Sequence, residues 1–259
     1  EPIENPADNE EFCKKFIELF PKKLKEIKKR LKLPNAEIIV AKDCSRKSIW
    51  RNYYYQLFNF EDKKLIQMLL DKEYNEFREY MKTQTIEKSK YKSGRNIKYD
   101  CSKFFELSYN NDLFLKHASK ILEYNELEAD DCISLYKKFN PSKNIIIIAN
   151  DHDYLQLLDD KCNLYNLKFK EITTEDKDIS LELKCILGDK SDNIKGLFKR
   201  CGEKTALKLI QDKTKFKKRC LDEEKEVDYL LNKRLIAFTE IPKTLQEEFY
   251  DYLCKYDAC

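Results

Sequence analysis

Residues 145–153 read Ile-Ile-Ile-Ile-Ala-Asn-Asp-His-Asp and contain the strongest strand signal in the chain. Four consecutive isoleucines bounded by polar residues are typical of a strand that is buried on both faces, as in a parallel sheet. The run ends at two acidic residues, Asp151 and Asp153. In open α/β sheets, ligands bind at the carboxyl ends of the strands. The segment therefore predicts a parallel sheet with an acidic site at one edge.

Two further segments complete the predicted sheet. The apolar run at residues 38–41 ends at Asp43 and predicts a second buried strand, and a short third strand is expected near residues 162–167. The segment 112–139 has a helical pattern with a break near Asn125. The order strand, helix, strand predicts a parallel sheet with helices on its faces.

Helices are predicted for most of the remaining chain. Apolar residues recur at helical spacing over residues 10–33, where Pro34 ends the pattern, and over residues 61–82. From residue 181 onward the pattern is helical throughout. The chain has only four glycines and six prolines in 259 residues, which argues against a turn-dense all-β fold. We therefore expect an α/β fold dominated by helices.

The overall charge does not by itself indicate a nucleic-acid-binding protein. Fifty basic and 47 acidic residues leave a net charge of +3, so the distribution of charge matters more than its sum. We expect the Lys-, Arg- and Tyr-rich segment 46–100 to lie outside the deep core, because charged residues are rarely buried.

None of the ten cysteines forms a C-x2-C pair, which argues against a zinc site. We interpret them as reduced, which indicates a cytoplasmic or nuclear compartment. No apolar run approaches 18 residues, so no membrane span is expected.

Four groups of acidic residues stand at the ends of predicted strands or near predicted helix starts. These candidate metal ligands are Asp43; Glu128, Asp130 and Asp131; Asp151 and Asp153; and Asp189 and Asp192. Converging carboxylates repel one another, and divalent cations relieve that repulsion. An oxygen-only donor set with few histidines favours Mg²⁺ or Mn²⁺ over zinc. Two such ions, about 4 Å apart, can activate water and stabilise the leaving oxygen of a phosphodiester. Helix capping by these acids is the alternative, and it explains any one group better than all four together.

Four motifs resemble those of the flap endonuclease and 5′–3′ exonuclease superfamily, which includes phage enzymes and the 5′ nuclease domain of bacterial DNA polymerase I. They are Glu-Ala-Asp-Asp at 128–131, the strand and Asp-x-Asp run at 147–157, Gly-Asp-Lys-Ser-Asp-Asn-Ile-Lys-Gly at 188–196 and Gly-Glu-Lys-Thr-Ala at 202–206. The resemblance covers roughly residues 36–245. Each motif alone is moderately specific, and the four in this order are highly specific.

This resemblance implies a PIN-like parallel sheet flanked by helices, followed by a helical C-terminal region. Residues 1–184 would form an α/β metal-dependent nuclease domain with an arch-like insertion at about 46–110. Residues 185–259 would form a helical DNA-binding region that contains a helix-hairpin-helix-type element. The expected partner is DNA with a 5′ flap, a nick or a 5′ end.

In that family the acidic residues bind two divalent metal ions. The resemblance places Asp43, Glu128 and Asp130 in the first metal cluster, and the other five candidate ligands in the second cluster or its outer shell. The Tyr-Lys-Ser-Gly-Arg segment resembles one whose Lys and Arg approach the scissile phosphate, which implies catalytic roles for Lys92 and Arg95. A cation there would stabilise charge on the transferring phosphoryl group. A solvated charge run is the alternative.

The segment 188–210 resembles the helix-turn-helix element with which the family grips duplex DNA. Backbone N–H groups of the turn, and the start of the following helix, would bind phosphates. The residues assigned to DNA are Lys199, Arg200, Gly202, Lys204, Thr205 and Lys208. A K⁺ ion is a further candidate at this turn. Arg200 and Cys201 replace a more usual Gly-Ile pair, which bears on the tightness of the turn.

The chain departs from the family pattern in two places. Family members begin with a strand that carries an Asp, whereas no such strand precedes residue 10, and Asp8 is interpreted as a helix N-cap. Either upstream residues are missing from this sequence or one metal ligand is absent. The stretch between Arg51 and Tyr91 is also longer than usual and is interpreted as part of an arch or its neighbour. Its aromatic residues would either stack on bases or pack within a helical hairpin; they are Tyr53, Tyr54, Tyr55, Phe58 and Phe60.

Three functions remain open on the sequence. The leading hypothesis is a two-metal 5′ nuclease that hydrolyses phosphodiesters at flaps, nicks or 5′ ends. The second is a catalytically impaired, structure-specific DNA-binding protein of the same fold. The third is a small RNase of the related PIN type, against which the duplex-binding motif at 188–206 argues. An Asp after an apolar strand upstream of residue 1 would favour the enzyme.

Overall fold

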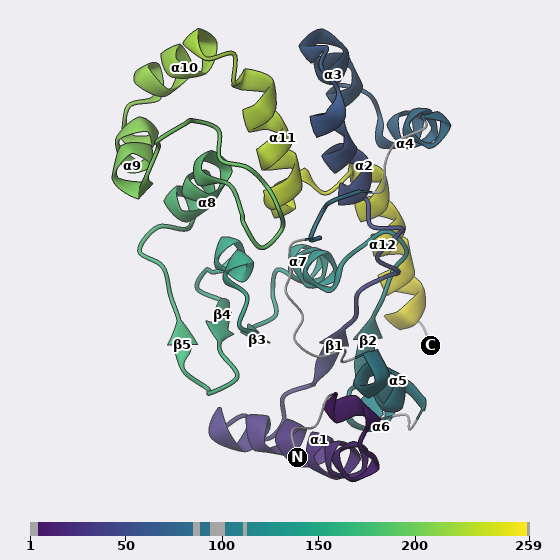
Figure 1. Cartoon of the computed structure of the whole chain (residues 1–259). Coiled ribbons are helices and arrows are strands. Elements are labelled where there is room, and N and C mark those ends of the chain that lie inside the picture. The colour runs from purple at the N-terminus through teal and green to yellow at the C-terminus, as the bar shows by residue number, and fades with distance from the viewer. Residues whose placement is uncertain (1–4, 85–88, 94–101, 111–112, 258–259) are drawn as a thin grey trace.

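The computed structural model describes residues 5–84, 89–93, 102–110 and 113–257, in which helices predominate (Figure 1). The α-helices are α1 (Glu10–Arg30), α2 (Arg51–Gln56), α3 (Lys63–Leu70), α4 (Tyr74–Thr83), α5 (Ser102–Asn110), α6 (Leu113–His117), α7 (Ala129–Phe139), α8 (Lys177–Leu187), α9 (Glu203–Gln211), α10 (Lys213–Asp222), α11 (Glu226–Ile236) and α12 (Lys243–Asp257). Short 3₁₀ helices are η1 (Pro6–Asp8), η2 (Leu57–Asn59), η3 (His152–Leu157) and η4 (Phe238–Glu240).

The strands form two separate pieces of sheet within the described residues. In one piece β1 (Ile39–Ala41) runs parallel to β2 (Lys120–Leu122). In the other, β3 (Ile145–Ile148) runs parallel to β4 (Cys162–Tyr165), and β5 (Glu171–Ile172) is antiparallel to β4. The predicted strands at 38–41, 145–148 and near 162–167 are therefore present. The parallel pairing of β1 with β2 and of β3 with β4 agrees with the expected α/β fold.

Strand β2 corrects the prediction of a helix over residues 112–139. Only α6 and α7 of that segment are helical, and Lys120–Leu122 between them pairs in register with Ile39–Ala41. Three residues carry too little periodic signal to distinguish a strand from a helix, and the pairing with β1 decides the outcome.

The start of α1 also differs from expectation. Asn9, and not Asp8, is the N-cap, because the Asn9 side chain accepts hydrogen bonds from the backbone N–H groups of Glu11 and Phe12. Asp8 ends the preceding 3₁₀ turn. The helix stops at Arg30, before Pro34, and Lys32 then adopts a left-handed φ of 56°. Because the Asn9 side chain caps the helix, α1 begins one residue later than a cap at Asp8 would imply.

The main hydrophobic core includes much of the charged segment 46–100, so the expectation that this segment lies outside the core is wrong. Trp50 and Phe77 are fully buried, and Arg51 is 2% exposed. The helices α3 and α4 are amphipathic: one face enters the core and the other carries the charges. Tyr54 stacks on Phe77 with ring centroids 4.3 Å apart. Of the five aromatic residues considered for base stacking, Tyr54 is thus packed between helices, as the hairpin alternative expects.

This core extends across the chain and joins distant segments. It includes residues of α2, α3 and α4 together with residues of α7, β3, β4, α11 and α12. A smaller second cluster joins the end of α8 to α9 and α10, through Ile186, Leu197, Phe198, Ala206, Leu209 and Cys220. The turn between α8 and α9 thus has a small core of its own.

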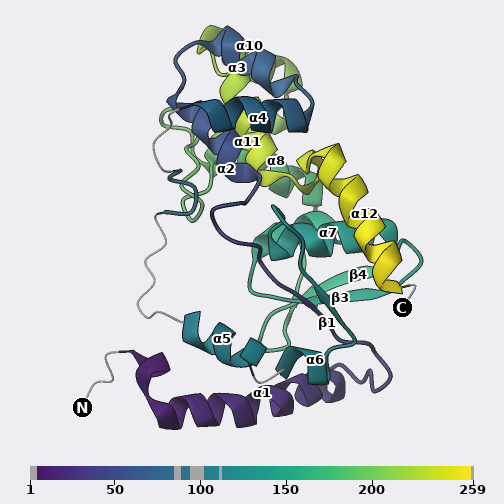
Figure 2. The same cartoon turned by 90° about the vertical axis from the view of Figure 1, so that its right-hand side faces the viewer.

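The helices lie on two sides of the strands. Helices α1, α5 and α6 lie together at one end, while α2, α3, α4 and α8 to α11 lie at the other (Figures 1 and 2). Helix α7 lies between the strands and the upper helices, and α12 runs alongside α7 (Figure 2). The start of α7 contacts α2, because Arg51 donates to Asp131.

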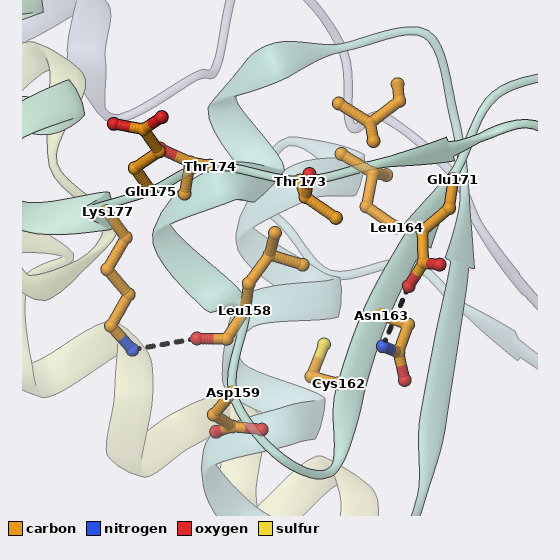
Figure 3. Close-up of a pocket in the computed structure, with 11 residues that line it drawn as sticks. Leu158, Asp159, Cys162, Asn163, Leu164, Glu171, Thr173, Thr174, Glu175 and Lys177 are labelled. Atoms are coloured by element: carbon orange, nitrogen blue, oxygen red, sulfur yellow. Dashed lines mark hydrogen bonds between the residues drawn. The ribbon is translucent and has the colours of Figure 1, made fainter.

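A hollow of about 330 Å³ lies beside β4 and β5, lined by residues that include Leu158, Cys162, Glu171 and Lys177 (Figure 3). None of the eight candidate metal ligands lines it.

Among the described residues, no helix is long and apolar enough to cross a membrane. Eight cysteines of the described residues are free thiols.

Candidate metal and nucleic-acid site

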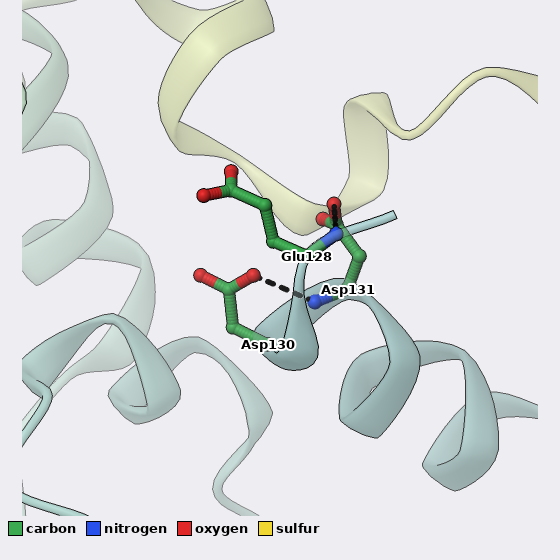
Figure 4. Close-up of side chains that lie close together, drawn as sticks. All are labelled: Glu128, Asp130 and Asp131. Carbon is green, nitrogen blue, oxygen red and sulfur yellow. Dashed lines mark hydrogen bonds between the residues drawn. The ribbon is translucent and has the colours of Figure 1, made fainter. Parts of the chain in front are cut away.

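The start of α7 gathers the first group of acidic side chains. Glu128 is the N-cap residue, and Asp131 closes a capping box in which its carboxylate accepts from the backbone N–H of Glu128 at 3.1 Å. Asp130 lies in the first turn and accepts from the N–H of Asp131 at 2.8 Å. Figure 4 shows the carboxylates of Glu128 and Asp130 pointing to the same side, while that of Asp131 turns back towards the backbone. The acidic motif therefore presents two side chains outward and one inward.

Residues at the start of α2 donate hydrogen bonds to the Asp131 carboxylate. Its two carboxylate oxygens each lie 2.7 Å from a guanidinium nitrogen of Arg51, and the indole N–H of Trp50 donates to Oδ2 at 2.9 Å. Asp131 is fully buried and Arg51 nearly so. Arg51 also donates to Glu128 at 3.1 Å. Both oxygens of Asp131 are thus occupied by donors, so Asp131 is better suited to fixing the start of α7 than to binding an ion directly.

Asp43 follows β1 and reaches the same helix start. Its Oδ1 accepts from the backbone N–H of Ala129 at 2.8 Å. This hydrogen bond satisfies one of the orphan N–H groups of α7. It also places an exposed carboxylate beside Glu128 and Asp130. Asp43 lies at the predicted sheet edge, although its observed role in this structure is that of a cap.

Asp151 and Asp153 follow β3, as the sequence predicts. Asp151 is exposed and caps η3, because its Oδ1 accepts from the N–H of Asp153 at 2.9 Å. Asp153 is partly buried and forms an ion pair with Lys184 of α8. The two acids therefore differ: Asp151 caps a turn, whereas Asp153 faces a second group of carboxylates.

The turn after α8 supplies that second group. Gly188 has a left-handed φ of 78°, and a Cβ there would lie 2.5 Å from the carbonyl oxygen of Ile194, so the turn requires glycine. Asp189 and Ile194 exchange two backbone hydrogen bonds of 2.9 and 2.7 Å, which close the turn. The Asp189 carboxylate accepts from the N–H and hydroxyl of Ser191, both at 2.7 Å. These bonds hold the Asp189 carboxylate within the turn, and both Asp189 and Asp192 are buried.

Two groups of three carboxylates result. Ligand atoms of Glu128, Asp130 and Asp131 lie within 4.8 Å of one another, and so do those of Asp153, Asp189 and Asp192. Six of the eight predicted ligands are thus brought together, while Asp43 and Asp151 lie outside both groups. Both sets contain only oxygen donors, the ligands that hard divalent cations such as Mg²⁺ prefer. The donor chemistry therefore fits the cations expected from the sequence.

Tyr91 and Lys92 lie between the two groups. The Tyr91 hydroxyl is 3.3 Å from both Glu128 Oε2 and Asp192 Oδ2. The Lys92 ammonium is 2.5 Å from Glu128 Oε1 and 3.9 Å from Asp192 Oδ2. Lys92 adopts a left-handed φ of 55°, and its carbonyl accepts from Arg46 at 2.6 Å. The two carboxylate groups therefore form one continuous acidic site bridged by two side chains.

The pKa values of these groups reflect crowding of like charge. Burial, followed by the charges of Glu128 and Asp131, raises the pKa of Asp130 well above its ordinary value. Burial also raises the pKa of Asp153. Burial raises the pKa of Asp189, but Lys184 and Ser191 lower it more, so its pKa lies below the ordinary value. The site thus contains carboxylates whose charge is poorly compensated unless a cation is near.

Two lysines supply part of that compensation. Burial alone would lower the pKa of Lys92, but Glu128 and other carboxylates raise it above its ordinary value. Lys184 pairs with Asp153 and lies 2.6 Å from Asp189. Burial opposes the charged form of Lys184 as well, and the two aspartates raise its pKa. Each set of three carboxylates therefore has one lysine ammonium group beside it: Lys92 for the first set and Lys184 for the second.

Sequence reasoning missed Arg51 and Lys184 as parts of this site. Arg51 gave no signal, because a single arginine in a charged segment is usually solvated. Lys184 precedes Gly188 by one helical turn, and that spacing could have indicated that it reaches Asp189. Arg95 lies outside the described residues, so its predicted role stays a prediction.

The six residues assigned to DNA are all exposed around the turn between α8 and α9; they are Lys199, Arg200, Gly202, Lys204, Thr205 and Lys208. Gly202 is the N-cap of α9 and no side chain caps this helix start. A Cβ at Gly202 would meet no atom within 4 Å. Arg200 adopts a left-handed φ of 54°, the conformation that glycine adopts most easily. The turn is therefore formed without the glycine that the resemblance implied at this position.

Comparison with known proteins gives a consistent result. The profile of the family described as "5'-3' exonuclease, N-terminal resolvase-like domain" matches residues 50–182. A 5′-3′ exonuclease of Buchnera aphidicola subsp. Schizaphis graminum is 30% identical over 195 residues, which cover 63% of this chain and 66% of that protein. A 5′-3′ exonuclease of Bacillus subtilis is 37% identical over 99 residues, which cover 33% of each. The chain thus spans between a third and two thirds of these relatives.

Solved structures share the fold. The T5 D15 protein co-crystallized with metal ions superposes with a TM-score of 0.62 at 16% identity, over 97% of this chain and 96% of that one. The bacteriophage T5 D15 flap endonuclease with DNA and metal ions gives a TM-score of 0.58 at 15% identity, over 93% of this chain and 90% of that one. With the family match, these likenesses show a resolvase-like, PIN-type α/β fold, which confirms the predicted PIN-like α/β class.

Proposed function

Because the chain belongs to the family of the 5′-3′ exonuclease N-terminal resolvase-like domain, we propose that it is a metal-dependent 5′ nuclease. Its reaction is the hydrolysis of phosphodiester bonds at 5′ flaps, nicks or 5′ ends of DNA. The observation that carries this proposal is the pair of oxygen-only carboxylate groups, bridged by Tyr91 and Lys92. The DNA complex of the structurally similar T5 D15 flap endonuclease supports DNA as the substrate class.

The residues divide into two sets of ion ligands. Glu128 and Asp130 would bind the first divalent cation, with Asp43 beside them, while Asp131 holds the start of α7 through Arg51. The second cation would be bound by the other group, with Asp151 at its margin; that group comprises Asp153, Asp189 and Asp192. Mg²⁺ or Mn²⁺, when bound, lowers the pKa of water and stabilises charge on the leaving oxygen.

Positively charged side chains would orient the substrate phosphate. Lys92 lies at the junction of the two carboxylate groups. A phosphate that reaches this junction would compete with Glu128 for its ammonium group, as expected of a cation that stabilises transferring phosphoryl charge. Arg95 is proposed to act with Lys92, since it follows three residues later.

The turn between α8 and α9 would bind the duplex in the manner of a helix-hairpin-helix element. The missing Cβ of Gly202 leaves the start of α9 open to a close approach from outside, and helix N-termini bind phosphates well. Lys199, Arg200, Lys204 and Lys208 would add charge, and Thr205 a hydroxyl. A K⁺ ion is proposed at the same turn, where backbone carbonyls and a phosphate could share it.

A catalytically impaired DNA-binding protein of the same fold is the second candidate. It is favoured by one observation: Asp43 and Asp151 lie outside both carboxylate groups and bind backbone N–H groups instead. The two candidates predict the same DNA affinity and differ only in turnover. Cleavage therefore separates them.

The proposal is tested with a labelled 5′-flap duplex in Mg²⁺ and in EDTA. We expect cleavage in Mg²⁺ only, and none from the Asp130→Asn variant prepared in parallel. Asp160→Asn, which changes an exposed acid outside both groups, is the matched control and should cleave as the wild type does. Binding without cleavage in Mg²⁺ or Mn²⁺ would select the second candidate. Equal cleavage in EDTA would refute a metal mechanism.

A further inference from the structure

Glu126 combines two features that are each unfavourable. Its backbone adopts a left-handed φ of 66°, a conformation that residues other than glycine rarely adopt. The residue is only 6% exposed, and a buried charge is costly unless it is paired and hydrogen-bonded. Such outliers persist where the surrounding structure enforces them. Glu126 stands two residues before the candidate ligand Glu128.

Both partners of the Glu126 carboxylate come from α4. The Tyr74 hydroxyl donates to Oε2 at 2.7 Å, and Arg78 Nη1 donates to Oε1 at 2.8 Å. Arg78 also lies over the Tyr74 ring, 5.6 Å from its centroid. Each carboxylate oxygen therefore has a separate donor, and the two donors are fixed against each other on one helix face.

The backbone around Glu126 is joined to the acidic site. The Glu126 carbonyl accepts from the N–H of Trp50 at 3.0 Å, and the next carbonyl, of Leu127, accepts from Cys44 at 3.1 Å. Trp50 and its neighbour Arg51 contact Asp131. The segment 124–128 thus runs between α4 on one side and the residues that hold the start of α7 on the other.

We propose that Glu126 is a positioning residue for Glu128: Tyr74 and Arg78 hold it in the left-handed conformation, and this conformation fixes the direction in which the Glu128 carboxylate leaves the chain. Helix α4 thereby acts on the first carboxylate group without touching it. The inference rests on the proposed function, because it concerns the geometry of an ion ligand. Metal affinity, and not only turnover, is the quantity that it governs.

The decisive comparison is between Glu126→Gly and Glu126→Gln. Glycine accepts the left-handed backbone readily but removes the side-chain anchor. Glutamine keeps both contacts, because its carbonyl can accept from Arg78 while its amide donates to the Tyr74 oxygen. If Glu126 matters only for backbone conformation, glycine is the better substitute. If the anchor positions Glu128, glutamine is.

The readout is the affinity for Mn²⁺, measured from the electron paramagnetic resonance signal of the free ion, with circular dichroism to confirm folding. We expect Glu126→Gly to weaken Mn²⁺ binding about 10- to 100-fold, the usual effect of removing a group that orients a metal ligand. Glu126→Gln should restore most of the affinity. Equal affinity of folded Glu126→Gly and wild-type protein would overturn the proposal.

Variants on α4 test the same contacts from the other side. Tyr74→Phe and Arg78→Met each remove one of these contacts without substituting Glu126 itself, and each should weaken Mn²⁺ binding. Glu76→Gln, on the same helix but exposed, should not. If Glu126→Gly does not fold, unchanged affinity in both α4 variants overturns the proposal. Failure of the wild type to bind Mn²⁺ refutes the proposed function and this inference together, whereas wild-type binding that the variants leave unaltered refutes this inference alone.

Discussion

Arg51 and Asp131, 80 residues apart in the chain, form a buried ion pair in which each carboxylate oxygen lies 2.7 Å from a guanidinium nitrogen. Removing one partner of such a pair leaves an unpaired buried charge, which typically costs about 3–5 kcal/mol. We therefore expect Arg51→Met to lower the free energy of unfolding by about that amount. Urea denaturation measures it. Arg219→Met breaks the more exposed pair with Glu223 and should cost under about 1 kcal/mol. Similar losses in both variants would contradict the anchoring role of Arg51.

The metal-free protein should lose stability as pH rises, through Asp130. The pKa of Asp130 is raised in the folded state, so between its ordinary and its raised value the folded state binds more protons than the unfolded state. Stability therefore falls as pH rises through this range. Thermal melting in EDTA between pH 4 and pH 8 should show a smaller fall for Asp130→Asn than for wild type. Parallel curves would show that Asp130 does not contribute.

Asp151→Asn and Asp153→Asn should each reduce cleavage severely while the fold stays intact. Asparagine caps a helix about as well as aspartate, so the hydrogen bond to the N–H of Asp153 survives in the first variant. What is lost is the negative charge near the second carboxylate group. Single-turnover cleavage and thermal melting on the same samples check both parts. Near wild-type cleavage by Asp151→Asn would assign that residue to capping alone.

Lys204→Ala should weaken duplex binding more than the chemical step. A residue that contacts one phosphate contributes about one unit to the slope of log affinity against log salt. DNA titrations at several salt concentrations in Ca²⁺, which should fill the metal sites without turnover, measure the slope. Lys23→Ala on α1 is the control, because α1 lies at the opposite end of the molecule from α9 (Figure 1). Equal slopes for wild type and Lys204→Ala would exclude the phosphate contact.

The sequence predicted those parts of the site that depend on local pattern. The isoleucine run indicated β3 and the acids at its end, and Glu128 with Asp130 was expected at a helix start. The glycine-containing motif at 188–196 also indicated the turn after α8, where the backbone of Gly188 suits glycine best. These features need a few neighbouring residues to define them. A short window of sequence is enough to read them.

Features that depend on distant partners could not be predicted. Strand β2 is defined by pairing with β1, which lies about 80 residues earlier in the chain. The inward turn of Asp131 depends on Arg51, whose burial contradicts the usual behaviour of an arginine. Helices α3 and α4 each bury one face and carry their charges on the other, and only the fold shows which face is buried. In each case the tertiary partner overrides the local preference.

The contacts of the Arg51 side chain can be completed only after most of the chain has been synthesised. Its Nε donates to the carbonyl of Leu235, 184 residues later, in addition to its bonds with Asp131. A chain synthesised from its N-terminus holds this guanidinium unpaired until α7 has been made, and incompletely paired until α11 follows. Contacts at such separations form slowly, because a large loop must close before they contribute. A ribosome-bound chain that ends before α11 therefore contains the carboxylates and Arg51, but lacks the Leu235 carbonyl that completes the contacts of Arg51.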